Sequence, residues 1–259
     1  MFIAQTWLKE LEREFCLDLV KDSSETLIWL EELNTRPKVD KKNYTPFTFD
    51  FESLYDSLDP KLVLTALRSA MDLTRSQWTK EFKDWIIDLV QLSIDASIGE
   101  FHERFFRQRN GLPTGGSLIV EIANITVFYV LKQVLFDNDT LCQDIVSVKR
   151  YIDDGIGIHT MTKRRFDCSK NKISSGVSQY GLKIKESDWL VPSNRDDPIN
   201  FLDINIWFDK DCALQTYIRN PQTLEVSSIL TAVIQIIHLL VLFILKEFAS
   251  AESSMMMIA

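Results

Sequence analysis

Two adjacent aspartates, Asp153 and Asp154, stand between apolar residues in the stretch KRYIDDGIGIHTM, residues 149–161. Aspartate and glycine both suit tight turns, and Gly155 tolerates positive φ, so the stretch predicts a hairpin with the carboxylates at its tip. Asp50 ends the strand-like segment TPFTFD and precedes a predicted helix, which would place it on a strand beside the hairpin. The simpler alternative is that Asp153 and Asp154 are solvated turn residues.

A cluster of three carboxylates would be suited to metal chemistry. Like charges at one point repel one another unless cations neutralise them. Mg²⁺ prefers carboxylate oxygens and keeps open positions for phosphate and water. Two such ions can stabilise the attacking and the leaving oxygen of a phosphoryl transfer. The pattern therefore predicts a phosphoryl-transfer site with two Mg²⁺ ions, provided that Asp50 lies near the hairpin.

The segments around these aspartates alternate between helical and strand patterns. Amphipathic spacing predicts two helices in the first forty residues. Asp59 and Pro60 are suited to cap and open a helix, and SQWTKEFKDWIIDLVQLSIDAS predicts a second one. SLIVEIANITVFYVLKQVLF is apolar nearly all round, so this helix should be buried. Two strand-like runs follow, INFLDINIWF and ALQTYIRN.

Composition limits the class of protein. A hydrophobic content of 46% over 259 residues is enough to build a core, and the net charge of -8 argues against binding nucleic acid by bulk charge. Any nucleic-acid role must use local basic stretches such as FHERFFRQRN. The four cysteines have neither metal-ligand nor disulfide-framework spacing, and the N-terminus lacks a signal-peptide pattern. We expect an intracellular protein, nuclear or cytoplasmic, that is not secreted.

Three motifs in order resemble those of reverse transcriptases. YIDD, at Tyr151 to Asp154, resembles motif C, FTFDFESLYDSL resembles motif A, and RQRNGLPTGGSLIVEIANI resembles motif B. NFLDINIWF followed by LQTYIRNPQT is similar to downstream segments of Penelope-like retroelement reverse transcriptases. The resemblance covers residues 44–223, and the order and spacing agree with a polymerase palm.

The resemblance implies an α+β fold, a palm in which an antiparallel sheet with packed helices carries the carboxylates. Residues 1–43 would be a helical, partial fingers segment, and no complete thumb is expected. The implied reaction is RNA-templated DNA synthesis, in which a primer 3′-hydroxyl attacks the α-phosphate of a nucleotide. RNA template, DNA primer and dNTPs would be the partners. With fingers and thumb incomplete, we expect weak or no activity.

The resemblance also assigns roles at the carboxylates. Asp50 and Asp153 would be the main ligands of two Mg²⁺ ions, with Asp154 adjacent and the carbonyl of Phe51 as a further ligand. Tyr55 matches the aromatic residue that excludes a ribose 2′-hydroxyl. A packed aromatic residue at a strand end is the alternative for Tyr55.

Further roles concern substrate binding. Gly111, Pro113 and Gly115 match the motif B turn, which lets the backbone approach the nucleotide, although turn formation alone would explain them. Gln108 matches a glutamine that precedes this turn, or is a surface residue. Lys183 or Lys185 would protonate the leaving pyrophosphate, or lie on an exposed strand edge.

The apolar tail, residues 224–259, has two interpretations. The run from Ile229 to Leu245 approaches the length that spans a bilayer, which would make it a membrane anchor. Alternatively the tail is read in a shifted frame, in which Met255 to Met257 would encode two aspartates. Two rival functions therefore stay open, a non-catalytic nucleic-acid or nucleotide-binding remnant and a tail-anchored membrane protein.

Overall fold

The computed structural model describes residues 2–37, 43–96, 98–102, 104–108, 110–116, 118–136, 144–194, 196–209 and 213–218. The chain divides into two units, residues 1–216 and 217–259, and the fold described here is that of the first. The predicted apolar tail lies outside the described residues. No helix within those ranges is long and apolar enough to cross a membrane.

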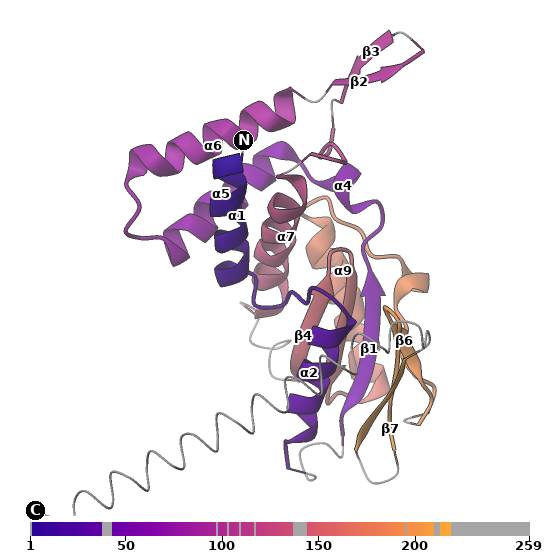
Figure 1. Cartoon of the computed structure of the whole chain (residues 1–259). Coiled ribbons are helices and arrows are strands. Elements are labelled where there is room, and N and C mark those ends of the chain that lie inside the picture. Colours follow the sequence, from indigo (N-terminus) through magenta and orange to yellow (C-terminus); the bar gives the residue numbers. More distant parts are fainter. Residues whose placement is uncertain are drawn as a thin grey trace, which may run out of the picture. The chain divides into compact units, whose positions relative to one another are not determined.

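Helices and strands are both plentiful, as predicted (Figure 1). The helical elements are α1 (Phe2–Phe15), α2 (Ser23–Asn34), α4 (Leu54–Ser57), α5 (Pro60–Thr74), α6 (Lys80–Asp95), α7 (Ile119–Leu131), the π-helical η1 (Lys132–Phe136), α9 (Lys163–Ser178) and the 3-10 turn η2 (Glu186–Asp188). The strands are β1 (Thr45–Asp50), β2 (Ile98–Phe101), β3 (Arg104–Arg107), β4 (Ile145–Tyr151), β5 (Asp154–His159), β6 (Ile199–Phe201), β7 (Ile204–Phe208) and β8 (Leu214–Ile218).

The central sheet has the order β1-β5-β4, and both pairings are antiparallel. Two glycines of β5 lie opposite two phenylalanines of β1, because Phe49 pairs with Gly155 and Phe47 with Gly157. A Cβ on Gly155 would lie 2.2 Å from the Phe49 ring, and one on Gly157 2.3 Å from the Phe47 ring. The alternating glycines therefore make room for the aromatic rings of β1, which fixes the register of the two strands.

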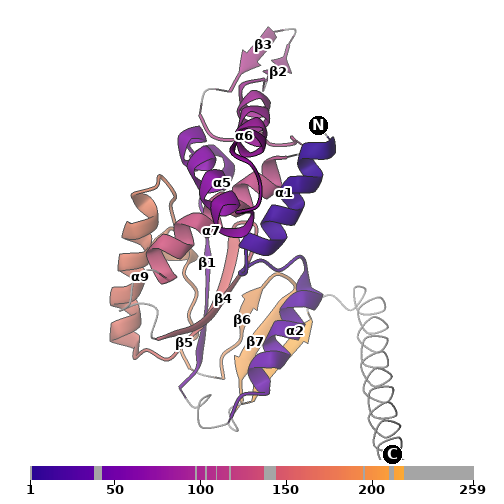
Figure 2. The ribbon, with the colours of Figure 1, turned by 90° about the vertical axis from the view of Figure 1, so that its left-hand side faces the viewer.

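Each face of this sheet is covered by a different layer (Figure 2). On one face, Phe47 packs against Phe166 of α9 and against Trp189, with ring centroids 5.1 and 6.0 Å apart. On the other face, Ile156 and Ile158 share a cluster with side chains of α2 and of the β6-β7 hairpin. The sheet is thus buried on both sides, and functional groups must lie at its ends.

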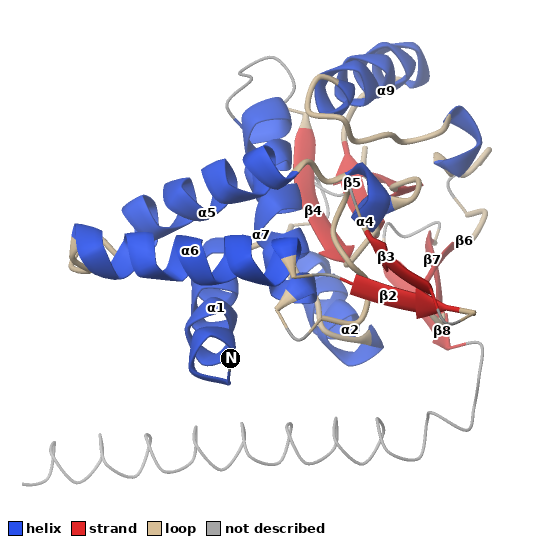
Figure 3. Cartoon of the chain, turned by 90° about the horizontal axis from the view of Figure 1, so that it is seen from above, coloured by secondary structure: helices blue, strands red, loops and turns tan. Residues whose placement is uncertain are grey.

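A group of four helices, α1, α5, α6 and α7, packs beyond the end of the sheet (Figure 3). Helix α7 is buried almost all round, as its apolar sequence predicts. The predicted start of α5 is confirmed as well, because the Asp59 carboxylate caps the helix by accepting from the Lys61 N–H, and Pro60 opens it. The basic stretch after α6 forms part of the β2-β3 hairpin, which the sequence analysis did not assign.

The turn of the aspartate hairpin differs from the prediction in one respect. The residue with positive φ is Ile152, at +52°, and Gly155 is not among the positive-φ residues of the described chain. Asp154 is already the first residue of β5, so the tip consists of Ile152 and Asp153. Gly155 is needed for the close approach of Phe49 instead of for the turn.

Candidate active site

The three predicted aspartates lie at one end of the central sheet, where Asp50 and Asp154 are paired and Asp153 lies in the adjoining turn. Asp50 is the last residue of β1 and lies directly opposite Asp154, the first residue of β5. Residues directly opposite on antiparallel strands direct their side chains to the same face. Asp153 precedes Asp154 in the turn, and its carbonyl accepts a hydrogen bond of 3.2 Å from the N–H of Phe51. Backbone hydrogen bonding therefore holds the two aspartate-bearing chain segments together.

The carboxylates lie close enough to affect each other's ionisation. Desolvation by burial, followed by the charges of Asp153 and Asp50, raises the pKa of Asp154 to about 6. The pKa of Asp50 is raised as well, by desolvation first and then by the charges of Asp153 and Asp188. Both shifts mean that the charged cluster is unfavourable in the folded chain until a cation compensates it.

The donor set fits a hard divalent cation. Asp50 Oδ1 is buried and accepts no hydrogen bond from the described residues. A hollow of about 280 Å³ adjoins Asp50 and Asp154, and Ser187 and Asp188 also line it. Within the described ranges, no three histidine, cysteine or carboxylate side chains are grouped so that they would hold a metal ion by themselves. Ligands from a bound substrate, such as phosphate oxygens, would have to complete the coordination.

Tyr55 lies near the carboxylates, on the short helix α4. Its side chain is half-buried, and desolvation followed by the charge of Asp153 raises the pKa of its phenol. The Tyr55 carbonyl accepts a hydrogen bond of 2.7 Å from the N–H of Leu112. Tyr55 thus connects the strand end that carries Asp50 with the glycine-rich turn.

The glycine-rich turn is packed against this segment. Gly111 has a φ of +73°, and a Cβ there would lie 2.6 Å from both Asp56 Cα and the Tyr55 carbonyl oxygen, so only glycine fits. Gly115, at φ +92°, has no atom within 4 Å of its Cβ position, so its backbone is open to an approaching molecule.

Gln108 has a structural partner within the same turn. Its Nε2 donates to the carbonyls of Asn110 (2.9 Å) and Leu112 (3.2 Å), so this exposed side chain stabilises the turn. Gln108, Gly111 and Pro113 also line a cavity of about 420 Å³. The three residues therefore lie close together at the turn, and their role in binding a nucleotide stays a prediction.

The two candidate lysines differ in their relation to Asp50. The Lys183 carbonyl accepts from the Glu52 N–H at 2.9 Å, so its backbone extends the strand next to Phe51, while its side chain is exposed. The charge of Lys185 partly opposes the rise in the pKa of Asp50, and its Nζ lies 3.2 Å from a carboxylate oxygen of Glu52. Of the two, Lys185 has the electrostatic influence on the site.

Sequence reasoning missed two residues near the carboxylates. Asp188 influences Asp50 from η2, and nothing in its local pattern distinguishes it from other surface acids. Arg150 is fully buried on β4 beside the aspartate turn. An arginine inside a strand otherwise suited to burial, directly before YIDD, was a signal for an internal partner.

No family model and no curated protein sequence matches the chain. The chain is, however, similar to several solved structures. Apo telomerase from Candida tropicalis, truncated from its C-terminal domain, is 16% identical with a TM-score of 0.66, over 83% of this chain and 44% of that one. Telomerase from Candida albicans, in complex with a fragment of telomeric RNA, is 15% identical with a TM-score of 0.65, over 82% and 38%. The RNA-dependent RNA polymerase of a human picobirnavirus is 11% identical with a TM-score of 0.56, over 82% and 38%.

These similarities establish the fold. The chain has the α+β palm-type fold found in these polymerases, with an antiparallel sheet, as the sequence analysis predicted. It spans less than half the length of each of them.

Proposed function

We propose that this chain is the palm of a reverse transcriptase, most similar to those of Penelope-like retroelements, that acts in RNA-templated DNA synthesis. One observation carries the proposal. Asp50 lies opposite Asp154, with Asp153 in the turn between β4 and β5, at the end of a palm-type sheet. The order of the sequence motifs supports a reverse transcriptase among the polymerases that share this fold.

The residues at the sheet end are suited to hold two Mg²⁺ ions. Asp50 and Asp153 would be the main ligands, with Asp154 adjacent and the carbonyl of Phe51 as a further oxygen. When bound, the ions would supply charge neutralisation for the attacking and the leaving oxygen of nucleotidyl transfer. The chain itself contributes positioning, because the bond from the Phe51 N–H to the Asp153 carbonyl ties the two ligand segments together.

The glycine turn and Tyr55 would form the nucleotide-binding side. Gly115 offers open backbone, while Gly111 allows the Leu112 N–H to bond the Tyr55 carbonyl. This bond sets where the phenol ring stands relative to a bound ribose. A lysine, Lys183 or Lys185, would donate a proton to the leaving pyrophosphate. RNA template, DNA primer and dNTPs are the proposed partners.

Primer extension tests this proposal. Any extension of a DNA primer on an RNA template with dNTPs and Mg²⁺ should be weak, and Asp153→Asn should lower its rate at least about a hundredfold, since charge neutralisation at phosphate is worth several kcal/mol. Asp88→Asn is the matched control, because Asp88 is an exposed aspartate on α6. Extension that Asp153→Asn leaves intact would contradict the assigned site.

A second readout separates catalysis from binding. If the chain binds dNTPs in a Mn²⁺-dependent manner that Asp153→Asn removes, but extends no primer, it is a binding module that keeps the palm site. If neither binding nor extension is seen, the site assignment fails.

Tyr55 tests the choice of sugar. Tyr55→Ala should raise ribonucleotide incorporation relative to deoxyribonucleotide by about tenfold or more, because one lost steric contact is worth 1 to 3 kcal/mol, roughly. The ratio is measured with matched ATP and dATP in single-nucleotide extension. Tyr180→Ala is the control, because Tyr180 is a partly buried tyrosine that follows α9. An unchanged ratio in Tyr55→Ala would mean that Tyr55 is a packed aromatic residue and does not exclude the ribose 2′-hydroxyl.

A further inference from the structure

Arg150 is the largest fully buried side chain that carries a charge. It lies on β4, two residues before Ile152 and three before Asp153, with 0% of its surface exposed. An arginine does not lose its proton inside a protein, so burying it requires a full set of acceptors. The hydrogen-bond acceptors of Arg150 therefore indicate its structural role.

The guanidinium group bonds to three separate segments of the chain. Its Nε donates to Asp18 Oδ2 at 3.0 Å, in the segment after α1. Nη1 and Nη2 donate to Oδ1 and to the carbonyl of Asn124 on α7, at 2.9 and 3.1 Å. Nη1 also donates to the carbonyl of Ile152 at 2.5 Å. The planar fork thus joins α7 and the N-terminal segment to the aspartate turn.

Ile152 is the residue that needs this support. Its φ of +52° lies in the left-handed region, which β-branched residues rarely adopt. The carbonyl that Arg150 holds belongs to the peptide group joining Ile152 to Asp153, so fixing it fixes the direction in which Asp153 leaves the turn. On the other side, the Asp153 carbonyl accepts from the Phe51 N–H. The backbone of the turn is therefore held from both sides.

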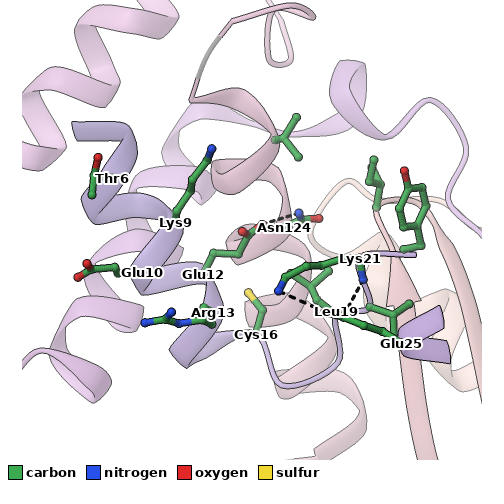
Figure 4. A pocket seen from close by; sticks show the side chains of 14 residues that line it. Thr6, Lys9, Glu10, Glu12, Arg13, Cys16, Leu19, Lys21, Glu25 and Asn124 are labelled. Carbon is green, nitrogen blue, oxygen red and sulfur yellow. Dashed lines mark hydrogen bonds and ion pairs between the residues drawn. The ribbon is translucent and has the colours of Figure 1, made fainter. Parts of the chain in front are cut away.

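The groups that hold Arg150 are fixed in turn. Asn124 Nδ2 donates to Glu12 Oε1 of α1 at 2.6 Å, on the wall of a pocket of about 740 Å³ (Figure 4). This bond orients the amide so that its oxygen faces Arg150. The backbone of Arg150 also pairs with the N-terminal segment, donating to the Asp18 carbonyl at 2.7 Å and accepting from the Val20 N–H at 2.9 Å. Arg150 is thus a rigid support.

We propose that Arg150 is a positioning residue for the metal-binding carboxylates. Through the Ile152 carbonyl it keeps the strained turn in the conformation that presents Asp153 and Asp154 to Asp50. The inference rests on the proposed function, because it assumes that these carboxylates bind divalent cations. A purely structural arginine would affect folding stability and leave the metal affinity of the folded protein unchanged.

The test is Mn²⁺ binding by the 259-residue chain, followed by the electron paramagnetic resonance signal of free Mn²⁺. Arg150→Lys keeps the charge but loses the fork, and should weaken Mn²⁺ binding by about tenfold or more, as outer-shell changes at metal sites do. Arg75→Lys is the matched control. Arg75 pairs with Glu10 and Glu14 between α5 and α1, and only 14% of its side chain is exposed. This variant should lose stability but bind Mn²⁺ like the wild type.

Each outcome decides the matter. Equal Mn²⁺ affinity in folded Arg150→Lys and Arg75→Lys overturns the positioning role while leaving the metal site intact. A wild-type protein that binds no Mn²⁺, or binds it equally after Asp153→Asn, overturns the proposed site and this inference with it. If Arg150→Lys does not fold, Asp18→Asn loosens the same guanidinium with no change of shape. It should weaken Mn²⁺ binding by about tenfold, the smallest effect typical of outer-shell changes, and unchanged binding overturns the proposal.

Discussion

His159 is a buried base at the far end of β5 from the carboxylates. It is 2% exposed and stacks on Phe166, with ring centroids 4.1 Å apart. Its Nδ1 accepts from the Met161 N–H, and Nε2 is buried with no hydrogen-bond partner among the described residues. Desolvation lowers the pKa of His159 to about 4, although the charge of Asp144 acts in the opposite direction. The folded protein therefore keeps this ring neutral.

A lowered histidine pKa makes stability depend on pH in a defined direction. Between the unfolded value of 6.5 and about 4, the unfolded chain binds the proton and the folded chain does not. The contribution of His159 to the free energy of unfolding should fall by about 2 kcal/mol between pH 7 and pH 5, while the raised pKa of Asp154 acts in the opposite direction. Urea unfolding at the two pH values measures it.

Two variants separate His159 from other acid-sensitive groups. His159→Gln should flatten the difference between pH 7 and pH 5. His102→Gln, at an exposed histidine of the β2-β3 turn, should leave the difference unchanged. An equally steep loss of stability in His159→Gln would assign the effect to other acid-sensitive groups. Asp50 and Asp154 cannot cause it, because their raised pKa values make protonation favour the folded state.

At the scale of elements, the β1-β5 pairing depends on glycines that admit aromatic rings. Gly157→Ala would place a Cβ 2.3 Å from the Phe47 ring, which itself packs on Phe166 and Trp189 and has little room to move. We expect a loss of about 1 to 3 kcal/mol in the free energy of unfolding, as overpacked cores show. Chemical denaturation measures this loss.

The control for this variant is Gly99→Ala on β2, where a Cβ meets no atom within 4 Å. It should change stability by less than about 0.5 kcal/mol. The double variant Gly157→Ala with Phe47→Leu should recover part of the loss, because the smaller side chain frees the space. If the double variant instead loses as much stability as the two single variants together, the β5 glycines do not serve to make room for the aromatic rings.

The predictable elements are those whose signals are local. The cap at Asp59, the apolar pattern of α7 and the strand before Asp50 each depend on residues within one element, and each prediction is confirmed. The proximity of Asp50 to Asp154 was predicted only conditionally, because it depends on strand order. The sheet register confirms it.

What sequence reasoning missed depends on contacts distant in the chain. The positive φ falls on Ile152 and not on Gly155. Arg150 donates a hydrogen bond to the Ile152 carbonyl, and the Phe49 ring occupies the space where a side chain at position 155 would lie. Arg150 meets Asp18 across 132 positions of sequence, which no local pattern reports. The metal-binding and substrate roles themselves stay predictions.

At the scale of the whole molecule, the charges of the clustered carboxylates lower the stability of the metal-free fold. The raised pKa values of Asp50 and Asp154 mean that their charges oppose folding near neutral pH. Asp50→Asn should therefore stabilise the metal-free protein and raise its melting temperature. Because solvent screens these charges, the gain in the free energy of unfolding should be less than about 1 kcal/mol. Thermal melts in EDTA measure this change, with the exposed Asp88→Asn as a control that should not stabilise the protein.

Mg²⁺ should reverse that order of stability. A ligand that binds only the folded state stabilises it by RT ln(1 + [L]/Kd), about 1.4 kcal/mol for about 10 mM Mg²⁺ and a Kd of about 1 mM. For a unit of this size the melting temperature should rise by about 3 to 6 °C in the wild type and in Asp88→Asn. In Asp50→Asn the rise should vanish, because one of the two proposed main ligands would have lost its charge. If Mg²⁺ raised the melting temperature equally in all three proteins, the ion would bind elsewhere on this acidic chain. The repulsion among the carboxylates at the sheet end would then not be relieved by a bound metal ion.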